Sequence, residues 1–212
     1  MIVVAPFCDT TDETEARAVF ADFYEIGPVA DMTKIHPYVD QNKVISGIQP
    51  HGPRTYMKGY GYDDMSVELL QHALDRFSSY VSDIRLDYQT SAIAFEAYPP
   101  DKLCEIAPEA TAIGSRGRHL NGIINLRWQN SEHDSYVQKF VRRFVDESRA
   151  IDSKVARGQG RTPVGNVGYG NFALFGERSE SEWFGGNLAK LRELKKKWDP
   201  NNRFSKGIPV SA

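Results

Sequence analysis

Apolar residues recur at helical spacing in three long stretches of the chain. These stretches cover residues 12–24, 66–82 and 131–151, and in each of them the apolar side chains stand three or four positions apart. Before the first stretch, Thr10 and Glu13 have the spacing of a capping box, in which two side chains satisfy free backbone N–H groups. The pattern predicts three amphipathic helices, each with one face to bury.

Short apolar or alternating runs between these helices predict β-strands. The runs cover residues 2–5, 54–62, 84–88, 91–98 and 119–128. Two of them follow each other closely, as antiparallel neighbours do, and no linker interrupts the chain. We therefore expect an α+β fold, in which an antiparallel sheet of about five to seven strands carries the helices 12–24, 66–82 and 131–151 on one face.

The alternation within the strands divides their side chains between two faces. Ile93, Phe95, Ile124, Leu126 and Trp128 fall on a face fit to pack under helices. The opposite face is more polar and is expected to hold Tyr56, Lys58, Tyr60, Glu96, Asn125 and Arg127. One interpretation is a solvated sheet face on which Glu96 and Arg127 form a cross-strand pair. The other is a ligand-facing surface, because tyrosines set among a few polar groups line many binding sites.

Composition and charge exclude several classes of protein. The 212 residues are 41% hydrophobic and 25% charged, and the formal net charge of -2 comes without a basic stripe that would indicate a nucleic acid or an anionic membrane as partner. No apolar run approaches the roughly 20 residues that span a bilayer. Cys8, Cys104 and the five histidines show no metal-binding or redox spacing. We expect a reduced, cytoplasmic protein without a metal site.

The end of the chain contains its most specific motif. The segments YGN (169–171), WFGGN (183–187) and KLRELKKKWDPNNRF (190–204) closely resemble the C-terminal signature of the berberine-bridge-enzyme family, whose members are FAD-linked oxidases of the vanillyl-alcohol-oxidase fold. TKIHPY (33–38) and RGRHLNGIINLRW (116–128) extend the resemblance over nearly the whole chain, and the sequences of these motifs are most similar to those of fungal members.

The resemblance implies a domain organisation. It indicates a single domain, with residues 1–160 similar to the family's substrate domain and residues 161–212 similar to its C-terminal segment. In the family, the flavin-binding half precedes the substrate domain, and nothing before Ile2 could supply it here. We therefore expect a chain that works without a cofactor, or with FAD only where a flavin-domain partner supplies it.

The resemblance also implies roles for individual residues. In the family, the closing helix and the Tyr-x-Asn loop pack onto the flavin domain, and Asn171 would help to seat the flavin. Tyr169 is a candidate phenolic acid or base, or else a packed aromatic with one hydrogen bond. His119 falls where relatives often have a His-Arg pair beside the substrate. The expected catalytic residues are Tyr169, Glu96 and His119, and the expected substrate-binding residues are Tyr56, Lys58, Asn125 and Arg127.

Three functions agree with these features. The first is a cofactor-independent enzyme of secondary metabolism that isomerises or cyclises a small molecule, and we prefer it. The second is the substrate-binding half of an FAD-dependent oxidoreductase whose flavin domain is a separate chain or has been removed. The third is a binding module without catalysis. Because the absent flavin domain would expose aromatic residues, we also expect the chain to form a homodimer.

Overall fold

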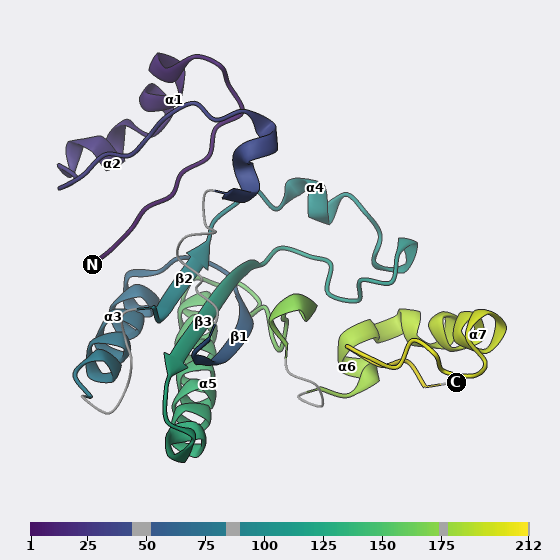
Figure 1. Ribbon diagram of the computed structural model, residues 1–212. Coiled ribbons are helices and arrows are strands. Elements are labelled where there is room, and N and C mark those ends of the chain that lie inside the picture. The colour runs from purple at the N-terminus through teal and green to yellow at the C-terminus, as the bar shows by residue number, and fades with distance from the viewer. Residues whose placement is uncertain (44–51, 84–89, 174–177, 212) are drawn as a thin grey trace. The chain divides into compact units, whose positions relative to one another are not determined.

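The computed structural model describes residues 1–43, 52–83, 90–173 and 178–211 (Figure 1). The chain divides into two compact units, Met1–Pro50 and His51–Ala212. The division therefore lies near residue 50, whereas the sequence indicates a single domain whose two sections meet near residue 160. That single domain stays a prediction.

An antiparallel sheet forms the centre of the His51–Ala212 unit. Its strands in the described residues are β1 (Arg54–Tyr62), β2 (Ala92–Glu96) and β3 (Leu120–Trp128), and their spatial order is β1-β3-β2. The α+β class is confirmed, but the prediction of five to seven strands is wrong for the part of the chain that the structure describes, where the sheet has three. The predicted strand at 84–88 lies outside the described residues.

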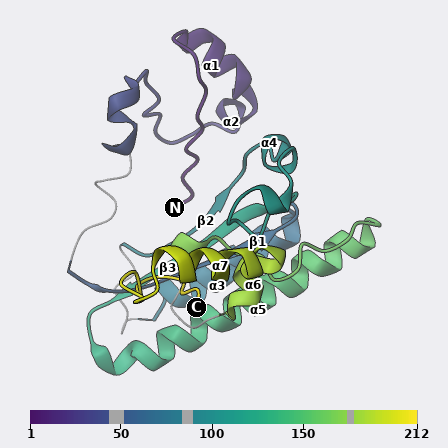
Figure 2. The same ribbon diagram turned by 90° about the vertical axis from the view of Figure 1, so that its right-hand side faces the viewer.

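Two helices cover one face of this sheet. α3 (Val67–Val81) begins after Ser66, whose hydroxyl accepts a hydrogen bond from the backbone N–H of Leu69. α5 (Asp134–Gly158) packs against β1, β3 and α3 (Figures 1 and 2). Both helices were expected, but α5 continues beyond residue 151 because its buried stripe does, through Asp152 and Ala156.

The core lies between the sheet and these two helices, and tyrosines make up much of it. Tyr60, Tyr62 and Tyr80 are at most 1% exposed. The hydroxyl groups of two of them donate to backbone oxygens, Tyr62 to Glu96 at 3.0 Å and Tyr80 to Arg127 at 2.9 Å. Buried tyrosines need such partners because an unpaired buried hydroxyl costs about 1–3 kcal/mol.

The side chains of β1 correct one part of the sequence analysis. The strand register pairs Tyr56 with Leu126, Lys58 with Ile124, and Tyr60 with Gly122. Directly opposed residues share a face, so these three β1 side chains belong to the helix-covered face and not to the polar one. Tyr56 is 5% and Tyr60 1% exposed in the core. A tyrosine has an apolar ring as well as a polar tip, and alternation alone did not show which of them decides its face.

The Met1–Pro50 unit consists of short helices and turns. They are α1 (Glu13–Val19), α2 (Ala21–Glu25) and η1 (Tyr38–Lys43). The expected single helix over 12–24 is interrupted at Phe20, and no strand forms at residues 2–5. The N-cap of α1 is Asp12 rather than Thr10, since the Asp12 carboxylate accepts the N–H groups of the first turn.

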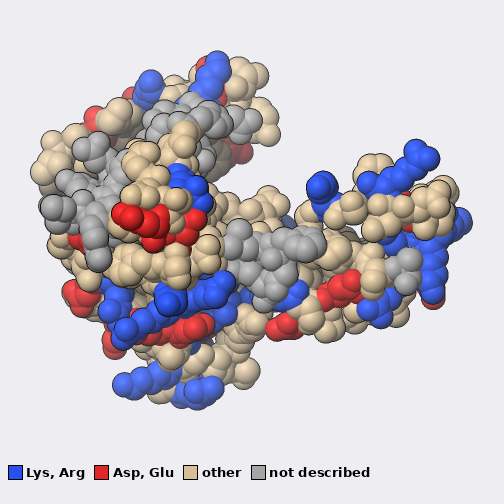
Figure 3. Space-filling model, turned by 60° about the horizontal axis from the view of Figure 1, so that its bottom comes forward, with Lys and Arg blue, Asp and Glu red and all other residues tan. Residues whose placement is uncertain are grey.

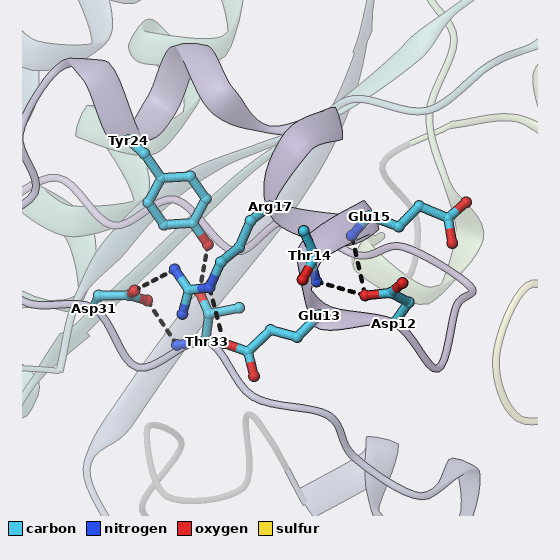
Figure 4. A network of polar contacts seen from close by, with 8 residues as sticks. All are labelled: Asp12, Glu13, Thr14, Glu15, Arg17, Tyr24, Asp31 and Thr33. Atoms are coloured by element: carbon cyan, nitrogen blue, oxygen red, sulfur yellow. Dashed lines mark hydrogen bonds and ion pairs between the residues drawn. The ribbon is translucent and has the colours of Figure 1, made fainter.

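Polar contacts hold this unit together (Figure 4). Arg17 bonds Glu13 at 2.8 Å and Asp31 at 2.7 Å, and the hydroxyl of Tyr24 lies 2.9 Å from that of Thr33. By contrast, no residue of the range 1–43 whose side-chain burial is described is buried. The unit therefore has a surface network but no described core.

Shorter elements complete the His51–Ala212 unit. They are α4 (Asp101–Cys104), η3 (Pro108–Ala110), η4 (Ser131–His133), η5 (Gly170–Phe172), α6 (Glu180–Phe184), η6 (Gly185–Asn187) and α7 (Leu188–Trp198). α7 is the closing helix, and Asp199 ends it by accepting the N–H groups of Arg203 and Phe204 while it pairs with Lys195. Among the described helices, none is both long and apolar enough to cross a membrane.

Candidate functional site

The face of the sheet opposite to the helices is the first component of the candidate site. The register places Asn125 beside Met57 and Ala92, and it places Glu96 beside Asn121. For β2 and β3 this agrees with the sequence alternation, which put Glu96, Asn125 and Arg127 on one face. We call this surface the open face. It consists of the odd-numbered residues from Thr55 to Gly61 and from Asn121 to Arg127, together with Ala92, Ala94 and Glu96.

Two polar residues of the open face are nevertheless buried. Asn125 is 8% exposed and Arg127 is 4% exposed. The backbone of Arg127 is fixed on both sides, because its N–H donates to the hydroxyl of Ser91 at 2.9 Å and its carbonyl accepts from Tyr80. The side-chain oxygen of Asn125 accepts no hydrogen bond within the described residues. A buried acceptor without a donor costs free energy, so Asn125 is a candidate partner for a ligand with an O–H or N–H group.

Glu96 stands at the other end of the open face. The amide of Asn121 donates to the Glu96 carboxylate at 3.2 Å and to the hydroxyl of Tyr98 at 3.1 Å. Burial, and then the negative charge of Glu96, raise the pKa of Tyr98 and keep its phenol protonated. The cross-strand pair between Glu96 and Arg127 does not form: Glu96 is opposite Asn121, six positions along β3 from Arg127, and six positions of a strand span about 20 Å.

The loop that contains Tyr169 lies along the free edge of β1. The N–H of Gly61 donates to the carbonyl of Val167 at 2.9 Å, and η5 contacts the same strand. A Cβ atom on Gly59 would stand 2.9 Å from the Cβ of Phe172, so only glycine allows the loop to approach this closely. The loop thereby brings Tyr169 next to the strand that borders the open face.

A small pocket of about 60 Å³ lies where this loop meets β1 and α5. Its lining includes Lys58 and Tyr169, which were both expected at the site, together with Arg149, Arg178 and Trp183. The Nη2 of Arg178 donates to the Oδ1 of Asn166 at 2.8 Å. The guanidinium carbon of Arg178 lies 4.7 Å from the centroid of the Trp183 ring, over which the group stacks. The pocket has room for a few water molecules or one small polar group and is too small for a whole substrate.

A larger groove of about 380 Å³ lies at the other end of β1. Tyr56 contributes to its wall, so the structure does not bring Tyr56 and Lys58 into one hollow. The polar groups of the groove pair with one another: Asp134 accepts from Arg54 at 2.6 Å and from the indole of Trp128 at 2.7 Å. The groove is therefore a weaker candidate for ligand chemistry than the open face.

His119 is separate from the other candidate residues. It is 7% exposed, and its Nδ1 lies 3.1 Å from the carbonyl of Gly117. Burial lowers the pKa of His119, although the contact with Gly117 opposes the shift, so the neutral ring is favoured. Within the described residues, no hydrogen bond or ion pair joins it to Glu96, Asn125 or Tyr169.

The expected site residues did not include Asn121 and Tyr98, which make the best-defined polar contact beside the open face. The alternation of the strands places both residues on this face, because Asn121 is four positions from Asn125 and Tyr98 is two positions from Glu96. In the described ranges, no group of three or more His, Cys, Asp and Glu side chains is arranged so that it could hold a metal ion. On the face seen in Figure 3, Lys and Arg are interspersed with Asp and Glu and form no basic stripe.

Comparison with known proteins finds a family model that matches the end of the chain. Residues 168–209, which include the Tyr169 loop and α7, match the family model described as berberine and berberine-like. The FAD-linked oxidoreductase pgmH of Aspergillus terreus is 24% identical over 93% of the chain, which covers 42% of that protein. The chain thus spans about two fifths of the length of this relative.

Two solved structures share the fold. A variant of berberine bridge enzyme superposes with a TM-score of 0.63 at 14% identity, over 93% of this chain and 43% of its own. CrmK is a flavoenzyme involved in shunt product recycling in caerulomycin biosynthesis. It superposes with a TM-score of 0.60 at 20% identity, over 92% of this chain and 41% of its own. These likenesses are structural and concern part of each larger protein.

The relatives correct the expectation of a cofactor-free protein. pgmH is an FAD-linked oxidoreductase and CrmK is a flavoenzyme, which contradicts the expectation that the chain works without a cofactor. The residues present fit one side of a flavin site, since Tyr169 and Phe172 offer aromatic surface and the orphan oxygen of Asn125 suits an N–H or O–H donor on either the flavin or its substrate. Residues 168–209 thus match the berberine and berberine-like family model, and the chain as a whole is similar to part of an FAD-linked oxidoreductase.

Proposed function

We propose that this chain is the substrate-binding part of an FAD-dependent oxidoreductase that acts on a small molecule of secondary metabolism. The observation that supports this proposal is that the family match lies beside the open face. The segment that matches the family model contains Tyr169 and Phe172, and Phe172 packs against Gly59 on β1, a strand of the open face with its buried polar residues. The flavin-binding part belongs to the remaining length of such enzymes.

The open face supplies binding groups in this proposal. The oxygen of Asn125 accepts a hydrogen bond from a substrate hydroxyl or amine, which relieves an unsatisfied buried acceptor. Arg127 gives the same face a positive charge, and Glu96 with Asn121 gives its other end a fixed polar pair. Small residues between these groups, Ala92 and Ala94, are exposed and leave space for a flat molecule.

Tyr169 supplies proton transfer in this proposal. Its phenol is 47% exposed beside β1, and its contacts with Asn171 and Phe172 fix the ring. A phenol in a fixed place can give or take a proton when a C–H or O–H bond of the substrate is oxidised. FAD, when bound, supplies the two-electron oxidation itself. His119, buried and neutral, has a structural role at the start of β3.

The experiment that tests this function joins the chain to the flavin-binding part of a relative. The flavin-binding part of the pgmH protein is produced in one polypeptide with this chain, purified with added FAD, and measured by visible flavin absorbance and its bleaching by candidate phenolic substrates. We expect flavin to be retained and bleached. Tyr169→Phe should retain the flavin and slow bleaching by roughly 100-fold or more, the range for loss of a proton-transfer group. Lys102→Gln, at an 88% exposed side chain, is the control.

The outcomes separate the alternatives. Loss of flavin from the joined protein, with the chain folded, contradicts a role beside FAD. Flavin retention with tight substrate binding but no bleaching favours a binding module. Equal bleaching by the unaltered protein and by Tyr169→Phe contradicts the proton-transfer role and leaves the binding role in place.

A further inference from the structure

Local contacts hold the phenol of Tyr169 in one place. The side-chain N–H of Asn171 donates to the Tyr169 hydroxyl oxygen with a separation of 2.7 Å. The ring of Phe172 meets the ring of Tyr169 edge-on, with their centroids 5.2 Å apart at an interplanar angle of 75°. This is the favoured geometry for two aromatic rings, so both the oxygen and the ring are fixed.

The loop that carries these residues is itself anchored. Phe172 sits in the space that Gly59 leaves on β1, and the Gly61–Val167 backbone bond lies on the same strand. On the other side, the Cα of Gly170 packs closely against the Ile208 side chain, where a Cβ would stand 2.9 Å from its Cδ1. The Tyr169 loop is therefore held between β1 and the C-terminal tail, and its side chains have few alternative positions.

The contact with Asn171 determines which way the Tyr169 hydroxyl can point. Conjugation with the ring keeps a phenolic O–H in the ring plane, which leaves two orientations. An amide N–H that donates to the oxygen occupies one side, and a second hydrogen cannot share it. The O–H must then point to the other side, away from Asn171. Because Tyr169 is 47% exposed, its proton remains available to a bound molecule.

We propose that Asn171 is a positioning residue, which orients the Tyr169 hydroxyl as a hydrogen-bond donor toward a ligand with a lone pair, such as a carbonyl, a hydroxyl or an amine. The nature of that ligand rests on the proposed function, whereas the orientation is a property of the loop. The family resemblance implied contact between Asn171 and the flavin. Here one amide N–H of Asn171 is used within the chain, on the residue two positions before it.

The test uses an Asn-to-Asp exchange, which reverses the hydrogen bond. Aspartate accepts hydrogen bonds and cannot donate them, so Asn171→Asp should turn the Tyr169 O–H inward. The chain is labelled with ¹³C at tyrosine Cζ, and Tyr169→Phe identifies the resonance. A phenol that donates has partial phenolate character, and its Cζ resonance moves downfield. We expect Asn171→Asp to move the Tyr169 Cζ resonance downfield. Asn171→Leu should place this resonance between those of the unaltered protein and of Asn171→Asp. Asn130→Asp, a matched change elsewhere in the chain, should leave the resonance in place.

This experiment distinguishes its own failure from that of the proposed function, because it needs neither FAD nor substrate. An unchanged Tyr169 resonance in both Asn171 variants would overturn the positioning role. In the joined protein, we expect Asn171→Asp to slow flavin bleaching about as much as Tyr169→Phe does, with little further loss in the double variant. Loss of flavin from the Asn171 variants, with Tyr169 unaffected, would instead assign Asn171 to the cofactor and overturn the proposal.

Discussion

The two compact units contain similar amphipathic helices and reach opposite states of burial. In the His51–Ala212 unit, α5 buries a stripe that includes Val137, Val141 and Phe144, and Phe144 is 1% exposed. In the Met1–Pro50 unit, α1 and α2 bury none of their residues, and Phe23 is 46% exposed. The apolar pattern is alike in both units, and in His51–Ala212 it packs against the strands β1 and β3.

This difference shows what a hydrophobic pattern can and cannot specify. The pattern determines which side of an element is to be buried, while the burial itself needs a second apolar surface. β1 and β3 provide one for α3 and α5. The residues predicted as a strand at 2–5 form no strand, and Ile2 and Val3 are 78% and 71% exposed. Burial is worth roughly 25 cal/mol per Å² of apolar area, so most stability should reside in the sheet and its two helices.

The largest effect should separate two phenylalanines. Phe144→Ala removes a ring that touches Tyr60 and stacks on His72, and it should lower the free energy of unfolding by about 3–5 kcal/mol. Phe23→Ala removes an exposed ring and should change it by no more than about 0.5 kcal/mol. Urea unfolding followed by far-UV circular dichroism, which detects the helices of both units, measures both. Equal losses would show that Phe23 is buried in solution, and the contrast between the two units would disappear.

Two glycines test how tightly the sheet region is packed. A Cβ on Gly122 would stand 2.4 Å from the ring of Tyr60, its partner across the strands. Gly122→Ala should therefore cost about 1–3 kcal/mol of unfolding free energy. Gly158→Ala is the matched control, since nothing lies within 4 Å of its Cβ position and alanine stabilises a helix relative to glycine by up to about 1 kcal/mol. A neutral Gly122→Ala would mean that the Tyr60 ring moves freely.

The two units should also differ in their response to pH. Burial raises the pKa of Asp152 on α5, although its hydrogen bond with the Asp63 N–H opposes the shift. Its contribution to stability is therefore complete below the ordinary carboxyl pKa and is lost as pH rises through the raised value. In Met1–Pro50, hydrogen bonds from Thr33 and then Arg17 lower the pKa of Asp31 to about 2. Its contribution is present above the ordinary pKa and is lost as pH falls toward about 2.

Unfolding curves across pH measure this difference. The three tryptophans lie in His51–Ala212, so their fluorescence reports on that unit. Asp152→Asn should remove the loss of stability on going from acidic to neutral pH. Asp31→Asn should leave the tryptophan-reported curve unchanged. A pH profile of Asp152→Asn that parallels the unaltered protein would show that Asp152 is not the titrating group.

The sequence was sufficient to predict elements whose signals are local. α3 lies close to the residues 66–82 expected for it, because it combines a periodic apolar stripe with a defined beginning at Ser66. The antiparallel α+β class and the shared face of Glu96, Asn125 and Arg127 also followed from alternation. These features depend on residues a few positions apart.

Features that depend on long-range pairing could not be predicted. The faces of β1 were exchanged because tyrosine suits either side of a sheet, and only the register with β3 decides. The Glu96–Arg127 pair failed for the same reason. At the candidate site, Tyr169 and Asn171 were both singled out, but the bond between them depends on how Gly59 and Ile208 hold the loop.

The smallest effect on stability, and the sharpest test of the exposed regions, concerns self-association. Val29 and Met32 of the Met1–Pro50 unit are 103% and 89% exposed, and Trp198 at the end of α7 is 72% exposed. Soluble monomers rarely expose large apolar patches, and a second copy of the chain is one partner that could cover them, so the homodimer expected from the sequence stays a prediction.

Sedimentation velocity over a series of micromolar concentrations should show association that weakens in Met32→Ser and in Trp198→Ser, with the free energy of unfolding changed by no more than about 0.5 kcal/mol. If only Met32→Ser weakens self-association, the contact lies in Met1–Pro50. If only Trp198→Ser weakens it, the contact lies on the closing helix. A protein that sediments as a monomer at every concentration would show that a second copy does not cover these surfaces.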